Sequence, residues 1–239
     1  KDEFNGEATA SKLARVREQM EKEEAQYHII STLDDIAWIL NVRGNDIPHV
    51  PVVLSFLVIG KEDAMWFVEE NALSDAVKEM AAECGITIRP YEDVYAYAAT
   101  IPEHSTVLLD KRKVNYRITN ALSETVHIVS KANPSQLMKA IKNEIELENT
   151  RKAHLLDGIA VTKFMYWLKK NVGKIPMDEV SVSDYLQSLR EQMEGYRDIS
   201  FDTIAGYNAN AAMMHYKAEP DTAAKLEPQG MLLVDSGGH

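Results

Sequence analysis

The sequence predicts an α/β unit with a mixed sheet, followed by a second unit in which long helices precede strands. Over residues 11–130, short apolar runs of strand length alternate with segments whose apolar residues recur on one helical face. Beyond a polar stretch around Pro134, a long helical pattern and a second helix precede strand-like pieces ending at Asp235. The 239 residues are enough for two cores, since single domains most often run to roughly 100–150 residues.

The first unit begins with an amphipathic helix and continues into a hairpin. Leu13, Val16 and Met20 share one face of the first helix, and Thr32 offers a hydroxyl cap to the second. The predicted elements are, in order, a helix over 11–24, a strand over 27–31, a helix ending at Leu40, a hairpin of strands 52–59 and 64–68, a helix over 74–84, and strands over 86–88, 107–109 and 126–129. This order predicts a mixed sheet with helices on both faces.

A linker is predicted where the first unit closes, over residues 130–135. Pro134 biases the residue before it away from helix, and the composition turns polar. We therefore expect two domains, 1–132 and 133–239. The second is predicted to hold a long helix from Asn143 to about Lys170, a helix over 180–193, and strands over 200–204, 211–216 and 231–235.

Composition and charge narrow the class of protein. Hydrophobic residues make up 45% of the chain and charged residues 26%, as in soluble globular proteins. The net charge of −11 argues against a nucleic-acid partner, because such partners are bound by clustered Lys and Arg. No apolar run approaches the roughly 18–20 residues that span a bilayer, so no membrane partner is expected. The single cysteine, Cys84, favours a reducing compartment, the cytoplasm.

The strongest local pattern is an apolar strand that runs into a carboxylate at Asp235. Buried ionised carboxylates are costly unless they are paired or bound to a metal, so metal ligation is one interpretation. The other is that Asp235, with Ser236 and Gly237, ends the strand and turns the chain. The pattern alone favours the turn.

The second candidate is His215, which follows small and apolar residues in a predicted strand. A lone histidine in that setting is more often a satisfied core residue than a catalytic one. The other upstream histidines lack metal-ligand spacing, and no phosphate loop, nucleophile elbow or dinucleotide fingerprint occurs. Spacing therefore leaves the role of His215 open.

Several separated motifs together resemble one family. They are STLDDIAWILNVRGNDI (31–47), MKAIKNEIE (138–146), RKAH (151–154), SFDTI (200–204), HYKA (215–218) and LVDSGG (233–238). In order and spacing they are similar to the long, three-domain aminopeptidase P enzymes, the Xaa-Pro aminopeptidases of the creatinase-like peptidase family M24. This resemblance covers essentially the whole chain. It implies a creatinase N-terminal-like domain over 1–132 and the first part of an α+β pita-bread catalytic domain over 133–239.

The resemblance also implies a chemistry. Asp235 corresponds to the first of five ligands to a pair of divalent ions, usually manganese. His215 corresponds to a histidine that contacts the substrate and helps to stabilise the transition state. The implied reaction is two-metal hydrolysis that releases the N-terminal residue from Xaa-Pro peptides. Because the other ligands would lie beyond His239 and the first domain before Lys1, residues 1–239 alone are expected neither to hold the ions stably nor to cleave peptides.

Two alternatives accompany this interpretation. The same fold serves as a non-catalytic peptide- or protein-binding module in some chaperone-type proteins, and within the enzyme class a prolidase or creatinase shares it. The presence of both His215 and Asp235 favours an enzyme, and the three-domain motif set favours aminopeptidase P. The expected partners are proline-containing peptides, with a homodimer left open for the whole protein.

Overall fold

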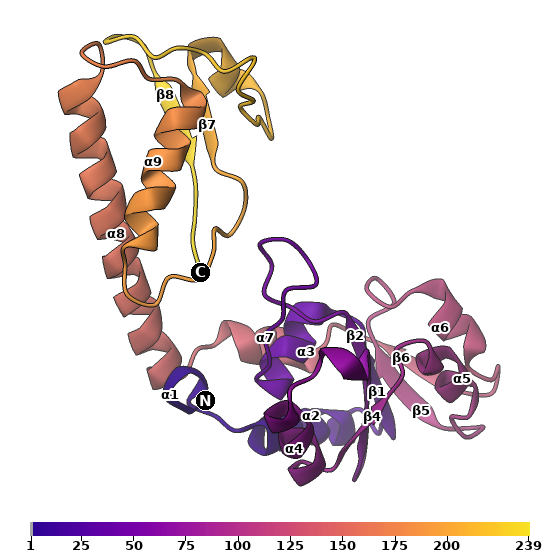
Figure 1. Ribbon diagram of the computed structural model, residues 1–239. Coiled ribbons are helices and arrows are strands. Elements are labelled where there is room, and N and C mark those ends of the chain that lie inside the picture. The colour runs from indigo at the N-terminus through magenta and orange to yellow at the C-terminus, as the bar shows by residue number, and fades with distance from the viewer. Residues whose placement is uncertain (1) are drawn as a thin grey trace. The chain divides into compact units, whose positions relative to one another are not determined.

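The computed structural model describes residues 2–239. The chain divides into two compact units, one ending at Leu147 and the other running from Glu148 to His239 (Figure 1). The first is built around a six-stranded sheet, and the second packs helices on a two-stranded sheet. Each unit has hydrophobic clusters of its own, as separate domains do.

The sheet of the first unit is mixed, as predicted. Its strands are β1 (Tyr27–Ile30), β2 (Ser55–Gly60), β3 (Ala64–Val68), β4 (Ile86–Arg89), β5 (Thr106–Leu109) and β6 (His127–Ser130). They lie in the order β4-β3-β2-β1-β5-β6. β2 pairs antiparallel with β1 and β3, which confirms the hairpin, and the three other pairings are parallel.

Helices cover both faces of this sheet because its strands are apolar on both sides. Along β2, Leu57 belongs to one hydrophobic cluster and Val58 to the other. The predicted helical face of Leu13, Val16 and Met20 is buried in the first cluster. The helices that contribute side chains to the first cluster are α2 (Thr9–Lys22), α3 (Leu33–Leu40) and α4 (Asp75–Glu83). Those that contribute to the second are α5 (Asp93–Ala99) and α6 (Tyr116–Ala121). Two short helices, α1 (Asp2–Asn5) and η1 (Glu70–Ala72), complete the helices of this unit up to β6.

The stretch predicted as a linker is instead docked on the first unit through α7 (Pro134–Ala140). Asn133, 5% exposed, donates from Nδ2 to Asp35 Oδ2 at 3.1 Å. Lys139 forms an ion pair with Asp35 Oδ1 at 3.2 Å. These contacts with the start of α3 hold α7 in the first unit, so the change of unit falls after the predicted boundary between 132 and 133.

The second unit packs two helices against a β-pair. Its elements are α8 (Glu144–Asn171), which begins in the first unit, α9 (Glu179–Glu191), β7 (Ile204–Tyr207), η2 (Asn208–Ala212) and β8 (Leu232–Asp235). β7 and β8 are antiparallel, with Tyr207 opposite Leu232. One cluster joins α8, α9 and β7 through Phe164, Leu186 and Ala205. Both predicted helices are confirmed, whereas the strand predicted over 200–204 lies later, in β7.

α9 is fixed at both ends by polar contacts. Asp178 and Ser181 form a capping box, in which Ser181 N donates to Asp178 Oδ1 at 2.7 Å. Near the other end, Arg190 is 2% exposed and donates from Nε to Asp157 Oδ1 of α8 at 2.6 Å. A charge-assisted bond of this kind is stronger than a neutral one, so it ties α9 firmly to α8.

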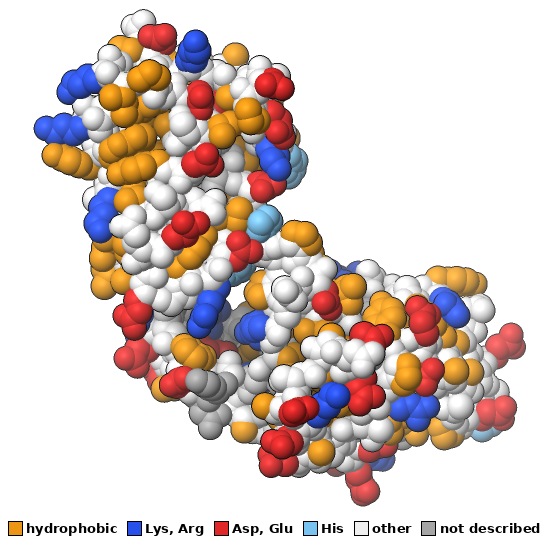
Figure 2. Space-filling view, viewed as in Figure 1, with side chains coloured by type: hydrophobic (Ala, Val, Ile, Leu, Met, Phe, Trp, Pro, Cys, Tyr) orange, Lys and Arg blue, Asp and Glu red, His pale blue; other side chains and the backbone are white. Residues whose placement is uncertain are grey.

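Apolar side chains are exposed along the outer face of α8 in the second unit. Leu155, Met165 and Tyr166 are among them, and hydrophobic side chains gather on that part of the surface (Figure 2). Over residues 2–239, however, no helix combines the length and the apolar character needed to cross a bilayer.

His28 is a titratable group buried in the middle of the first unit. It lies on β1, and its Nδ1 donates to the carbonyl oxygen of Leu108 at 2.9 Å. Its Nε2 is buried without a partner among the described residues. Burial lowers the pKa of His28 to about 4, because the charged imidazolium would lose its hydration.

Acid is therefore expected to destabilise the chain through His28. Its folded pKa of about 4 lies below the ordinary 6.5, so the unfolded chain binds more protons in this range and the free energy of unfolding falls as pH drops from 6.5 toward 4. The full contribution is about 3 kcal/mol. Urea unfolding of His28→Gln near these two pH values should show a smaller pH dependence than the wild type. His127→Gln removes an exposed histidine and should keep the wild-type pH dependence. If the free energy of unfolding changed equally with pH in all three proteins, His28 would not be the group responsible.

Candidate functional site

Asp235 is the last residue of β8, where it lies opposite Ile204 of β7. The sequence argument assumed a strand that carries its carboxylate toward a core, but Asp235 is exposed, as are Leu233 and Val234 before it. The side chain forms no hydrogen bond or ion pair within residues 2–239. Both carboxylate oxygens therefore keep their lone pairs free to accept a ligand.

The chain stays extended after Asp235 instead of turning. Ser200 N donates to the carbonyl oxygen of Gly237 at 3.0 Å, and Gly238 forms an antiparallel bridge with Ile199. Close packing explains these glycines, since a Cβ on Gly238 would lie 3.0 Å from a ring carbon of Tyr196. The turn signal in the sequence was misleading for this reason.

The structure places His215 in a turn, so the strand predicted over 211–216 is wrong. His215 has φ of +53°, a left-handed conformation that costs a non-glycine residue on the order of 1 kcal/mol. Its imidazole is exposed and makes no hydrogen bond in the described part of the chain, unlike a satisfied core histidine. Close packing at Gly206 explains why no strand forms here. A Cβ there would lie 2.9 Å from Cα of Ala211, so the small residues pack on β7 as the 3-10 helix η2.

A buried carboxylate, Glu179, organises the segment that carries His215. Glu179 is the first residue of α9 and is 0% exposed. Its four hydrogen-bond donors are Tyr207 N at 2.6 Å, Asn210 Nδ2 at 3.0 Å, the Tyr216 hydroxyl at 2.6 Å and Ala224 N at 2.8 Å. They come from the end of β7, from η2, from the residue after His215, and from the loop that leads to β8.

These contacts set the charge state of the cluster. Burial raises the pKa of Glu179, but the hydrogen bonds, led by that from Tyr216, outweigh it and hold the pKa below its ordinary value. The same contact raises the pKa of Tyr216 to about 12. Glu179 is thus a charged carboxylate with all of its roughly four acceptor sites occupied.

Sequence reasoning missed Glu179 because an acidic residue at the start of a helix has an ordinary explanation. Acidic side chains favour the first helical turn through the helix dipole, and Asp178 beside it is the cap. The feature of the sequence that could have revealed Glu179 is its place on the apolar face of the helix. Glu179, Val182 and Leu186 follow the spacing of one helical face, and all three are buried.

The structure places His215 and Asp235 in the same unit without joining them by a hydrogen bond or ion pair among the described residues. From residue 2 to 239, no group of three or more His, Cys, Asp or Glu side chains is arranged to hold a metal ion. Asp235 fits one ligand position, because a free carboxylate is the kind of donor that hard divalent cations accept. Glu179 does not fit, because donors from the protein already occupy its oxygens.

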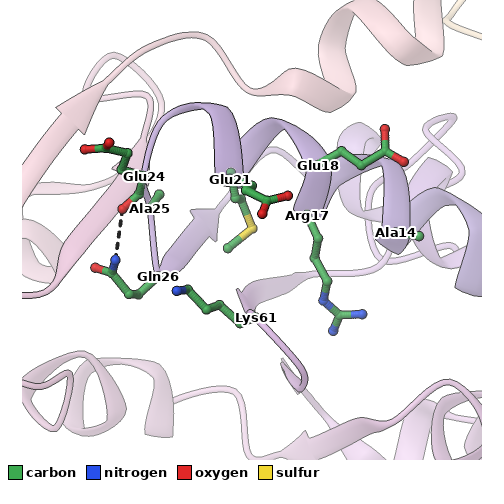
Figure 3. A pocket seen from close by; sticks show the side chains of 9 residues that line it. Ala14, Arg17, Glu18, Glu21, Glu24, Ala25, Gln26 and Lys61 are labelled. Atoms are coloured by element: carbon green, nitrogen blue, oxygen red, sulfur yellow. Dashed lines mark hydrogen bonds between the residues drawn. The ribbon is translucent and has the colours of Figure 1, made fainter.

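A surface hollow in the first unit lies beside α2 (Figure 3). There Arg17 donates to the carbonyl oxygens of Gly60 and Asp63, at 3.0 and 2.9 Å, and so ties α2 to the hairpin turn. The other charged residues that line the hollow are Glu18, Glu21, Glu24 and Lys61. Neither of the predicted site residues is among the lining residues.

The fold and the site define a class of protein. A mixed-sheet α/β unit is followed by a unit in which a strand presents a free carboxylate at its end, and this is a creatinase/prolidase-like arrangement. The chain belongs to the family of the Creatinase/Prolidase N-terminal domain, which its residues 1–146 match. Residues 148–239 match metallopeptidase family M24. The two matches correspond to the two compact units, and the family resemblance seen in the sequence is confirmed.

Relatives of known name agree with this assignment. Xaa-Pro aminopeptidase 1 of Dictyostelium discoideum is 36% identical over 99% of this chain and 38% of its own length. Aminopeptidase P2 of Arabidopsis thaliana is 33% identical over 98% of this chain and 37% of its own length. The chain thus spans less than half the length of these relatives.

Solved structures share the fold. The crystal structure of X-prolyl aminopeptidase from Caenorhabditis elegans, described as a cytosolic enzyme with a di-nuclear active site, superposes with a TM-score of 0.93 at 28% identity, over 100% of this chain and 40% of that one. The prolidase of Pyrococcus horikoshii has a TM-score of 0.66 at 19% identity, over 95% of this chain and 60% of its own. The second likeness extends to the fold alone.

Gly206 gives a test of how the His215 segment is packed. Gly206→Ala is expected to lower the free energy of unfolding by about 1–3 kcal/mol, because the added Cβ would collide with backbone atoms of Ala211. Gly158→Ala is the control in α8, where no atom beyond the neighbouring helix backbone lies within 4 Å of the added Cβ, and it should stabilise the helix by up to about 1 kcal/mol. Denaturant unfolding of both variants checks the opposite signs, and equal effects would refute the packing argument.

Proposed function

We propose that the protein containing this chain is a metal-dependent aminopeptidase that releases the N-terminal residue from Xaa-Pro peptides. The observation that carries the proposal is the free carboxylate of Asp235 at the end of β8, in a chain that belongs to this family. The names of the Dictyostelium and Caenorhabditis relatives support the substrate class. We further propose a cytoplasmic location, in keeping with the single cysteine.

In this proposal Asp235 is one ligand to a pair of divalent ions, with manganese the proposed metal. Bound divalent ions supply Lewis acidity and lower the pKa of a water molecule, so that amide hydrolysis can proceed at neutral pH. The chain supports such a role for Asp235 in two ways. The carboxylate has no competing partner among the described residues, and pairing of the following residues with 199–200 holds the backbone around it extended.

His215 is proposed to contact the substrate and to stabilise the transition state. Its imidazole is exposed and keeps both nitrogens free of protein partners in the described chain. A neutral or charged imidazole can donate a hydrogen bond to an oxygen on which negative charge develops. The left-handed turn presents the ring to solvent instead of packing it into the core.

Substitution of Asp235 tests the proposal in the complete gene product. Asp235→Asn should lower manganese-dependent cleavage of an Xaa-Pro peptide by about 100-fold or more, because loss of metal assistance removes several kcal/mol of transition-state stabilisation. Asp184→Asn, at an exposed position of α9, is the matched control and should cleave like the wild type. A chelator should abolish wild-type cleavage, and added manganese should restore it. Full activity in Asp235→Asn would show that Asp235 is not a required metal ligand.

A further inference from the structure

Glu179 closes the segment that carries His215 into a loop held at both ends. At the near end, Tyr207 N donates to Oε1 at 2.6 Å, and at the far end Ala224 N donates to Oε2 at 2.8 Å. Between them, Tyr216 donates its hydroxyl to Oε2 at 2.6 Å. One buried carboxylate therefore fixes the start, the middle and the end of this loop.

The contact in the middle of the loop lies directly beside His215. Met214 on one side of the histidine is 92% exposed, and the imidazole has no hydrogen bond among the described residues. Tyr216 on the other side is anchored twice, because its hydroxyl also accepts from Asn210 Nδ2 at 3.0 Å. The next residue, Lys217, pairs with Asp202 at 3.0 Å, but both side chains are exposed, and exposed ion pairs constrain a chain weakly.

The left-handed backbone at His215 needs such an anchor. A non-glycine residue keeps φ near +53° only where its surroundings determine that conformation. The partly buried bond from the Tyr216 hydroxyl to Glu179 is the side-chain contact directly next to it. The direction in which the imidazole projects therefore depends on this bond.

We propose that Glu179 and Tyr216 are positioning residues for His215, so that the buried carboxylate sets where the imidazole meets the substrate. This inference rests on the proposed function, since it assigns a purpose to His215 only if His215 acts on a peptide. Glutamine cannot replace Glu179 in this role. An amide has one acceptor oxygen instead of two, and its NH₂ group would face donors.

The test is a double-mutant cycle in the complete gene product, which combines Tyr216→Phe with His215→Ala. Tyr216→Phe alone should lower kcat/KM for an Xaa-Pro peptide by about 10-fold, since misplacing a reacting group by about 1 Å can cost up to about 100-fold. In the His215→Ala background it should cost less than about 2-fold, because residues that act through one another are not additive. Tyr166→Phe, an exposed tyrosine of α8, is the matched control and should match the wild type.

If Tyr216 had a purely structural role, the double-mutant cycle would give a different result. Tyr216→Phe would then reduce kcat/KM by the same factor with and without His215, and that result would overturn the proposal. Wild-type kcat/KM in Tyr216→Phe would overturn it as well. Rates are compared per mole of folded enzyme, so a loss of stability alone does not imitate positioning.

Hydrogen exchange separates this inference from the proposed function. Amides of residues 208–217 should exchange faster in Tyr216→Phe than in the wild type, while those of 148–171 in α8 stay unchanged. Unchanged exchange over 208–217 contradicts the positioning role whatever the activity. If the wild type cleaves no Xaa-Pro peptide and Tyr216→Phe still exchanges faster, the proposed function is wrong, and the structural link between Glu179 and the His215 turn is supported.

Discussion

The second unit depends on one interaction, the burial of the Glu179 carboxylate among donors from the protein. Removing an ionised carboxylate from water costs several kcal/mol unless donors replace its hydration. Two backbone amides, one phenol and one side-chain amide do so here. Because these donors come from β7, η2, the turn at His215 and the loop before β8, all four segments must reach the start of α9. Their common meeting point constrains the path of the chain from Tyr207 to Ala224.

The first unit rests on a different constraint, apolar burial on both faces of its sheet. Strands with apolar residues at successive positions need a cover on each side, and the two clusters of helices supply it. Its polar connections are local by comparison. The contacts of Asn133 and Lys139 with Asp35 extend the unit beyond its last strand by fastening α7 to α3.

What the sequence could predict follows from this difference. Periodic apolar burial leaves a pattern in the sequence, so the strands around the hairpin and the helix of Leu13, Val16 and Met20 were predicted correctly. Single polar contacts between distant residues leave no period. The docking of Asn133 and the donors around Glu179 were therefore missed. Small residues occur both in turns or strands and where two segments pack closely. Near Gly206 they allow close packing where a strand was expected, and near Gly238 they do so where a turn was expected.

Glu179 and Asp235, two carboxylates of the second unit, differ in the donors that surround them. Glu179 accepts hydrogen bonds at every available site and has a lowered pKa, so it is charged but has no lone pair to offer a metal. Asp235 is exposed and accepts no hydrogen bond from a described side chain, so its lone pairs remain available. A carboxylate satisfied by the protein holds a fold together, whereas one left unsatisfied at the end of a strand can accept a ligand. The same distinction underlies our proposals that Asp235 binds a metal and that Glu179 positions His215.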